Sequence, residues 1–326
     1  MKSKGPRALS TVGVVDHTPT DLMYARRLIH PLTRTAIPGI YTVRPYLPKV
    51  PLRSAILDWS GTTIDPHSGA PIVAFIRLLK KYGIDIPGSQ AVGKMGTHKM
   101  SHLKGLFDDP QVMAQWIANS KTKSPPTQED FDQMFADFVP IQLEVLSDKT
   151  HTTLIPGVGP SIQTLRSKYG FKIGVTTGFT RKMTDVILPS VRAQGFVPDA
   201  CVSADEVPRS RPFPDGCRAN MIQLGTETPD EVMKAGDSQL DMEEGIRAGC
   251  VTVGIASYSP TIGQKMLVFR EEAEKRKSHN PNPNDEWVEK WLQESREHLA
   301  ESGPHFVVDT FEQIPILVGQ IQSHFS

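Results

Sequence analysis

The chain has 326 residues, of which 38% are hydrophobic and 22% charged, and its 36 basic side chains equal its 36 acidic ones. This composition is typical of a globular protein of one or two domains, and the zero net charge argues against a general binder of nucleic acid or of anionic membranes. Three widely spaced cysteines form neither a disulfide framework nor a metal-ligand pair, which indicates reduced thiols in an intracellular protein. No stretch approaches the roughly 18 apolar residues of a membrane span.

The first fifty residues differ from the rest, because basic side chains clearly outnumber the two acidic ones, Asp16 and Asp21. A basic, acid-poor start that is rich in Ser and Thr is typical of an organelle transit peptide and equally of a disordered arm. We therefore treat residues 1–50 as an N-terminal extension, disordered or targeting, and expect the folded domain to begin near Leu52. A transit peptide would direct the protein to an organelle; without one we expect it in the cytoplasm.

A short buried strand is predicted over residues 54–60, and a long helical region follows it. Apolar residues recur every three or four positions over 71–84, which predicts a helix that stops near Gly83. Further helices are predicted over 88–107, 111–120 and 131–146, and the last is introduced by Thr-Gln-Glu-Asp at 127–130. Residues 70–151 contain no convincing strand, so we expect them to form a separate helical domain.

Beyond Pro156 helices and strands alternate. Predicted helices cover 159–170, 181–195, 214–225 and 241–249, and predicted strands lie within 171–178, 198–207, 231–237 and 250–256. The tail adds a charged helix over 266–277, a Pro/Asn linker, an amphipathic helix around Trp287 and Trp291, a strand over 305–310 and a helix over 311–322. Alternation of this kind predicts a parallel sheet covered by helices on both faces. The core domain would comprise residues 51–69 and 152–326, interrupted by the helical domain of 70–151.

Four of the predicted strands end in polar residues whose types suit phosphoryl transfer. In chain order these residues are Asp58, Thr177 with Gly178, Arg211, and Asp237 with Asp241. Because parallel sheets bind ligands at the carboxyl ends of their strands, we expect these residues to lie together. A carboxylate can attack phosphorus, Thr and Arg can hold phosphoryl oxygens, and grouped carboxylates can bind Mg²⁺. Taken singly, each is more often a helix cap, a turn or a surface residue, so the order of all four carries the argument.

The four segments DWSGTTID, VTTG, RPFPD and GDSQLD resemble, in order, the four motifs of the haloacid dehalogenase (HAD) superfamily. The resemblance covers roughly residues 52–260. It implies an α/β fold with a Rossmann-like core, an inserted helical type 1 cap, an aspartyl-phosphate intermediate and Mg²⁺. It also implies that the ion is held by Asp58, the backbone carbonyl of Ser60 and Asp237, with Asp241 either ligating or supporting.

Position 60 departs from the phosphatases of that superfamily, which have an acid there to protonate a leaving alkoxide. Ser60 is a poor proton donor, so either the protein is impaired or its leaving group is not an alkoxide. In the predicted helix over 88–107, Met95, Lys99 and His102 follow an i, i+4, i+7 spacing and would share one face. Ordinary core packing and a lysine that reaches out to solvent explain this pattern too.

A buried lysine offers a mechanism in which the leaving group is not an alkoxide. Desolvation lowers the pKa of an amine such as Lys99, and the free amine forms a Schiff base with an aldehyde. The iminium accepts the electrons of a breaking bond between carbon and phosphorus, so the leaving group is an enamine. No acid is then needed at position 60.

The motifs DW-x-GTT-x-D, MG-x-x-K-x-x-H, TTG-x-TR, RP-x-P and SGPHF make the chain similar to the phosphonoacetaldehyde hydrolase (phosphonatase) family. The similarity runs from Leu52 nearly to the C-terminus, apart from a charged insert around 265–300. It implies cleavage of the P–C bond of phosphonoacetaldehyde to acetaldehyde and phosphate, in 2-aminoethylphosphonate degradation, and a homodimer formed through the cap. The resemblance implies that Lys99 forms the Schiff base and that Met95 and His102 are the catalytic residues beside it, with His102 as proton shuttle. It implies that Asp58 is the nucleophile. Phosphate binding falls to Thr177, Gly178 and Arg211.

Two positions depart from that family. Phe179 stands where it often has Tyr, and Ser68 where it often has Cys; both bear on rate and cap closure. Two alternatives stay open: a HAD phosphatase that acts on phosphate esters, and a catalytically silent HAD-like interaction protein. In the preferred interpretation the partner is a small molecule, and neither nucleic acid nor a membrane is involved.

Overall fold

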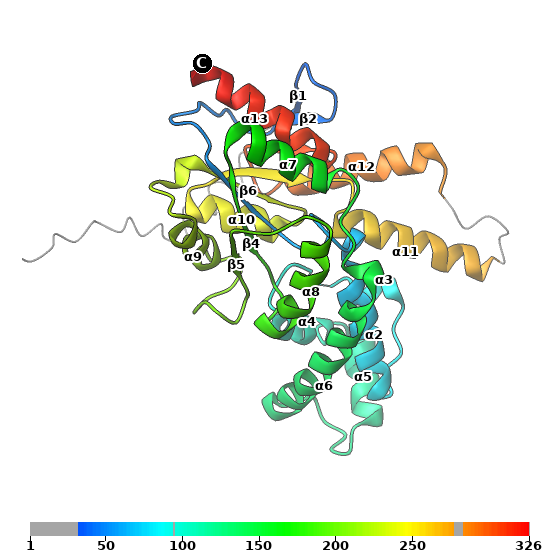
Figure 1. Cartoon of the computed structure of the whole chain (residues 1–326). Helices are drawn as coiled ribbons and strands as arrows, with labels where there is room; N and C mark the ends of the chain where they lie inside the picture. The colour runs from blue at the N-terminus through cyan, green and yellow to red at the C-terminus, as the bar shows by residue number, and fades with distance from the viewer. Residues whose placement is uncertain (1–31, 94, 277–282, 326) are drawn as a thin grey trace, which may run out of the picture.

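The structure is a computed structural model that describes residues 32–93, 95–276 and 283–325. One eight-stranded sheet runs through the molecule, with helices on both of its faces and a helical cap on one side (Figure 1). The strands are β1 Thr33–Arg34, β2 Ile40–Thr42, β3 Ser54–Leu57, β4 Lys172–Thr176, β5 Ala200–Val202, β6 Val232–Gly236, β7 Val251–Ile255 and β8 Phe306–Val308. Their spatial order is β1-β2-β8-β7-β6-β3-β4-β5.

Strands β3 to β8 are parallel, which confirms the predicted α/β fold. These strands are mostly apolar on both faces, as is typical of parallel strands between helical layers. Alternate residues of β3 face opposite layers: Ile56 packs with side chains of α9 and α10, whereas Ala55 and Leu57 belong to the larger cluster with α7, α8 and α13. After β3 the chain adds strands first on one side and then on the other, so the topological switch point lies at the carboxyl end of β3.

The helices of the core follow the predicted alternation closely. They are α7 Val158–Tyr169, α8 Arg181–Ala193, α9 Asp215–Leu224, α10 Gln239–Ala248, α11 Pro260–Lys275, α12 Asp285–Ala300 and α13 Ile314–Gln322. In the described ranges, none of the helices has the length and apolar character needed to cross a membrane.

The N-terminal segment requires a correction. β1 and β2 form a hairpin, and β2 pairs antiparallel with β8, with Ile40 opposite Val308. Ile40 is fully buried, so the expectation that the folded domain begins near Leu52 is wrong for residues 32–50. Strands of two and three residues carry no periodic pattern, which is why the sequence did not reveal them. Residues 1–31, on which the transit-peptide and disordered-arm alternatives chiefly depend, lie outside the described residues.

The region between β3 and β4 forms the helical cap, as predicted, and its described residues contain no named strand. Its helices are α2 Gly69–Lys81, α3 Gly88–Ala91, α4 Lys99–Leu106, α5 Pro110–Asn119 and α6 Gln128–Ser147. The predicted start of α6 is confirmed by a capping box between Thr127 and Asp130. Phe75 of α2 stacks on Phe138 of α6, with ring centroids 4.5 Å apart, in the interior of the cap.

The single helix predicted over 88–107 is wrong. α3 ends at Ala91, α4 begins at Lys99, and an irregular turn joins them. Gly93 and Gly96 adopt positive φ angles of 41° and 90°, a conformation that glycine allows and that stops a helix. Met95 therefore lies on the turn and does not share a helical face with Lys99, although the two come together in another way, described below.

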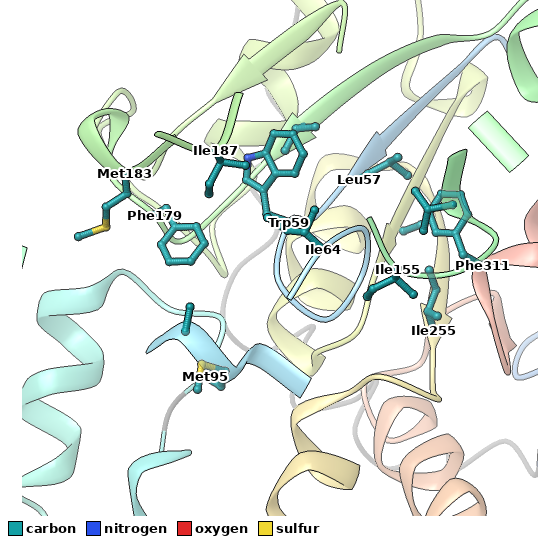
Figure 2. Close-up of a cluster of buried hydrophobic side chains, with 14 of the residues drawn as sticks. Leu57, Trp59, Ile64, Met95, Ile155, Phe179, Met183, Ile187, Ile255 and Phe311 are labelled. Atoms are coloured by element: carbon teal, nitrogen blue, oxygen red, sulfur yellow. The ribbon is translucent and has the colours of Figure 1, made fainter. Parts of the chain in front are cut away.

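The cap and the core share one continuous hydrophobic cluster. Figure 2 shows Leu57, Trp59 and Ile64 on the core side of this cluster, and Met95 approaching Phe179 from the cap side. Gly178 allows a close approach here, because a side chain at this position would lie 2.5 Å from the carbonyl oxygen of Thr97. The turn of the cap is thus packed directly over the carboxyl end of β4.

Candidate active site

The site is built around Asp58, the first residue after β3, at the topological switch point. Its amide hydrogen-bonds the carbonyl of Ala235 on β6, so the sheet itself fixes the start of the loop. The tight turn that follows needs Gly61, which has a φ of 83° and whose missing side chain would lie 2.1 Å from the Asp237 carboxylate. Thr62 then donates a 2.5 Å hydrogen bond to Asp237. The first motif thereby joins the carboxyl ends of β3 and β6.

Three buried carboxylates converge at this edge. One oxygen each of Asp58, Asp237 and Asp241 lies within 4.8 Å of the others. Burial raises the pKa of Asp58, and burial together with the charges of Asp58 and Asp241 raises that of Asp237 well above its ordinary value. Carboxylates held this close repel one another unless a cation lies between them, so the cluster could hold a hard divalent metal ion.

Asp241 differs from the other two acids. One of its carboxylate oxygens lies 3.0 Å from Arg211 Nη1 and 2.8 Å from Lys234 Nζ, and the other accepts hydrogen bonds from Ser238. Burial opposes its ionisation, but the charges of Arg211 and Lys234 outweigh burial and lower its pKa. Since both oxygens already have partners, Asp241 fits the supporting role better than the ligating one.

Arg211 lies at the centre of a buried charge network. Its Nη2 donates to Asp58 Oδ1 at 2.9 Å and to the carbonyl of Thr176 at 2.7 Å, and its Nε donates to Glu244 Oε2 at 3.0 Å. These contacts hold the guanidinium beside Asp58, where it can neutralise phosphoryl oxygens.

Lys234 and Glu244 belong to this network, and the sequence analysis missed both. Lys234 is fully buried within β6 and donates to Thr176 Oγ1 at 3.0 Å as well as to Asp241. Glu244 on α10 accepts from Arg211 and from Thr176 Oγ1. A lysine inside the apolar strand VMKAG was a signal that could have been used, because a fully buried lysine requires an anionic partner.

Lys99 reaches the same pocket from the cap. Its side chain is buried, and Nζ lies 4.8 Å from the centre of the Phe179 ring. Burial, opposed in part by the charges of Asp58 and Asp65, lowers the pKa of this amine to about 8. A large fraction of the amine is therefore unprotonated in mildly alkaline solution, as a nucleophile requires.

The structure brings most of the predicted residues into one pocket. Those that line it are Asp58, Ser60, Met95, Lys99, Thr177, Gly178, Arg211 and Asp237. Ser68 and Phe179, the two positions that depart from the family pattern, line it as well. Thr177 Oγ1 accepts from the amide of Phe179 at 3.1 Å, which orders the loop after β4.

Asp241 and His102 do not line this pocket. Asp241 lies behind it, in the charge network. His102 is fully buried in the cap, with Nε2 3.1 Å from the Ala91 carbonyl and its ring 4.3 Å from that of Phe75. His102 thus contacts the end of α3, next to the turn between α3 and α4, and not the pocket.

Comparison with known proteins agrees with this geometry. Residues 52–249 match the family model of the haloacid dehalogenase-like hydrolases, so the fold and the site define a hydrolase of that class. A phosphonoacetaldehyde hydrolase of Syntrophobacter fumaroxidans is 35% identical, covering 85% of this chain and 94% of that protein. One of Parabacteroides distasonis is 36% identical, covering 83% and 97%. The chain belongs to the phosphonoacetaldehyde hydrolase family, which confirms the resemblance noted in its sequence.

A solved structure supports the same assignment. The phosphonoacetaldehyde hydrolase-like protein of Oleispira antarctica superposes with a TM-score of 0.75 at 27% identity, covering 86% of this chain and 96% of that one. Hydrolases of the HAD class generally depend on a metal ion, which accords with the cluster of Asp58, Asp237 and Asp241.

Proposed function

We propose that this hydrolase cleaves the P–C bond of phosphonoacetaldehyde, giving acetaldehyde and phosphate, through a Schiff base on Lys99 and a phosphorylated Asp58. The observation that carries the proposal is a buried amine of lowered pKa in one pocket with a nucleophilic carboxylate and a fixed arginine. The names of the relatives, which are phosphonoacetaldehyde hydrolases, support the choice of substrate.

The reaction begins in the cap half of the site, which Met95 and Lys99 form. The unprotonated Nζ of Lys99 adds to the aldehyde carbon. The resulting carbinolamine takes up a proton from solvent and loses water, which leaves an iminium ion that carries one positive charge. Met95 and Phe179 surround this position with apolar surface, which excludes water that would otherwise reverse the condensation. The Phe179 ring lies near Nζ and stabilises the positive charge.

The second step takes place in the core half of the site, which Asp58, Thr177 and Arg211 form. A carboxylate oxygen of Asp58 attacks phosphorus, and the electron pair of the breaking P–C bond moves into the iminium to form a neutral enamine. Arg211 and Thr177 hold the phosphoryl oxygens as the bond breaks. Protonation of the enamine carbon and hydrolysis of the imine release acetaldehyde, and water hydrolyses the acyl phosphate on Asp58. No alkoxide forms, so Ser60 need not be an acid.

Mg²⁺ is the ion that we propose for the acidic cluster. Asp58, the backbone carbonyl of Ser60 and Asp237 would hold it, since all three are oxygen donors and the two acids have raised pKa values. Bound there, the ion supplies positive charge that reduces the repulsion between Asp58 and the phosphonate. Asp241 supports this arrangement through Arg211 and Lys234.

The role of His102 as a proton shuttle stays a prediction. Its contacts with the Ala91 carbonyl and the Phe75 ring favour a different contribution, namely holding the turn that carries Met95. The place in 2-aminoethylphosphonate degradation, the homodimer through the cap and the cytoplasmic or organellar location are likewise predictions from the sequence. Gel filtration with light scattering would test the dimer.

The decisive experiment measures acetaldehyde release from phosphonoacetaldehyde with Mg²⁺, in an assay coupled to reduced nicotinamide, for the wild type and Lys99→Ala together. We expect turnover by the wild type alone, and borohydride with the substrate to inactivate only the wild type by reducing its imine. A phosphate-ester phosphatase would hydrolyse esters in both forms and would be insensitive to borohydride. A silent interaction protein would turn over neither substrate.

A further inference from the structure

The chain crosses between core and cap twice, and the two crossings lie side by side. The first, residues 64–69, leads from the loop after β3 into α2, and the second, residues 147–156, leads from α6 back towards α7. A β-bridge joins Ile64 to Leu154, and the amide of Ile155 donates to the carbonyl of Thr63 at 2.9 Å. Any movement of the cap relative to the core must pass through this pair of segments.

A partly buried ion pair links the crossings through side chains. His151 Nδ1 lies 2.7 Å from Asp65 Oδ1, and only 1% of the Asp65 side chain is exposed. The same carboxylate accepts the amide of Ala70, in the first turn of α2, at 3.0 and 3.1 Å. The bond to Asp65 raises the pKa of His151, which favours its charged form. One carboxylate thus connects the beginning of α2 to the short 3-10 helix, Lys149–His151, that follows α6.

The backbone of the first crossing has an unusual conformation. Asp65, His67 and Ser68 have φ angles of 50°, 62° and 56°, in the left-handed region that residues with a side chain rarely adopt. Among the described residues, the only other non-glycine with a positive φ is Lys123. A run of this kind persists only where surrounding contacts hold it, and such strain is concentrated at functional sites.

The contacts that hold this turn come from three directions. The His67 amide donates to the carbonyl of Tyr258 at 3.0 Å, and α11 approaches so closely that a side chain on Gly263 would lie 2.7 Å from His67 Cβ. The third contact is made by the Asp65 carboxylate, which binds His151 and the amide of Ala70. As a result Ser68, at the end of the turn, lines the pocket that contains Asp58 and Lys99.

We infer that Asp65 and His151 form a clasp that fixes both crossings, so that the left-handed turn presents Ser68 to the pocket and the cap holds Lys99 over Asp58. Both are positioning residues, since neither lines the pocket. The inference rests on the proposed function for its kinetic consequence, but the state of the crossings can be measured without any substrate. Removing His151 leaves the buried Asp65 without its counter-charge, and removing the charge of Asp65 leaves the partly buried His151 without its own, so either change loosens the turn.

The test compares four variants of the full chain. His151→Leu keeps a side chain of similar bulk and removes the donor, whereas His151→Asn keeps an N–H near the position of Nδ1. Asp65→Asn removes the charge of the partner. Lys81→Gln is the matched control, because it breaks the 2.7 Å ion pair to Asp137, which also joins α2 to α6 but is more exposed.

Two measurements are made on each variant: hydrogen exchange of peptides covering 64–70 and 149–156, and the separate kcat and KM for phosphonoacetaldehyde. We expect His151→Leu and Asp65→Asn to exchange faster in both peptides. Their KM should rise about tenfold, as it would if the closed cap fell to about a tenth of the population, with a smaller change in kcat. His151→Asn should recover most of both effects, and Lys81→Gln should resemble the wild type.

Protected peptides and unchanged KM in His151→Leu would overturn the inference. So would equal loosening in His151→Asn and His151→Leu, because the clasp requires the N–H. If the wild type does not turn over phosphonoacetaldehyde, the proposed function fails, and the exchange data alone decide whether the clasp exists.

Discussion

The two halves of the site are held in different ways. Asp58 directly follows β3, where a hydrogen bond of the sheet fixes it, and Arg211, in the loop between β5 and α9, is fixed by a buried charge network. Met95 and Lys99 stand on or beside an irregular turn of the cap, fixed by packing against Phe179 and Gly178. In the proposed mechanism the phosphoryl chemistry would therefore lie on the sheet, and the amine that reacts with the aldehyde would lie on the inserted domain.

Asp58→Asn should separate the two halves most sharply. Without the nucleophile we expect acetaldehyde release to fall by at least about ten-thousandfold, because no alternative carboxylate reaches phosphorus with the same support from Arg211. The cap half should survive, so borohydride with phosphonoacetaldehyde should still modify Lys99, as peptide mass spectrometry would show. Loss of both activities would mean that the halves are not independent.

Lys99→Met removes the cap half and keeps the apolar volume. Turnover should fall by about a thousandfold or more, since the electron sink for the P–C bond is gone. Binding of phosphate to the core half, measured by calorimetry with Mg²⁺, should change little. Comparable loss of phosphate binding would contradict the division between cap and core.

The same substitution should stabilise the protein. The folded-state pKa of Lys99 is about 8, below its ordinary 10.5, so the unfolded chain binds the proton more tightly and burial costs stability at neutral pH. This penalty is fully present below pH 8 and fades as the pH rises towards 10.5. At pH 7 Lys99→Met should therefore raise the free energy of unfolding by up to about 3 kcal/mol. Urea unfolding at pH 7 and pH 10 should show the gain shrinking at the higher pH.

Glu244→Gln tests whether the core half depends on a residue outside the pocket. The amide still occupies the space but no longer balances Arg211 and Lys234, so Arg211 should hold Asp58 less well. We expect kcat to fall by about thirtyfold and the protein to lose about 3 kcal/mol of stability, the scale for breaking a buried ion pair. Borohydride trapping at Lys99 is the control and should be unaffected; a loss of trapping would place Glu244 in the cap half as well.

The pH dependence of trapping reports on the cap half alone. Only the unprotonated amine condenses, so the rate of borohydride inactivation at saturating aldehyde should rise through a pKa of about 8. Between pH 6.5 and pH 8.5 the increase should be about twenty-fivefold. A rate that is flat over this range, or that still rises steeply above pH 9.5, would show that Lys99 is not desolvated in the working enzyme.

The sequence predicted that the polar residues of the core would lie together, for a physical reason. Once helices and strands alternate, the carboxyl ends of parallel strands must meet at one edge, so Asp58, Arg211 and Asp237 had to converge. Lys234 and Glu244 escaped notice because their partners lie on other elements. The lysine within the strand VMKAG indicates that an anionic partner is needed, but nothing local identifies Glu244 on a distant helix as part of the same network.

The cap half was predicted for partly the wrong reason. The spacing of Met95 and Lys99 suggested one helical face, but Gly93 and Gly96 break the helix, and the two residues meet because the turn folds over Phe179. Both residues line the pocket, but they do so through a turn and not through a helical face. The hairpin of β1 and β2 was missed because very short strands acquire their register only from β8.

Phe179 joins the two halves, and its substitution should have the smallest effect. The ring lies 4.8 Å from Lys99 Nζ and stabilises the ammonium form, an interaction worth about 1 kcal/mol. Phe179→Leu keeps the pocket apolar but removes this stabilisation, so the pKa of trapping should fall below that of the wild type by less than about one unit. Phe179→Tyr retains the ring and should leave that pKa in place, which makes it the matched control. An upward shift in Phe179→Leu would mean that the ring acts by excluding water from the amine, and that the cap half depends on the β4 loop for desolvation more than for charge.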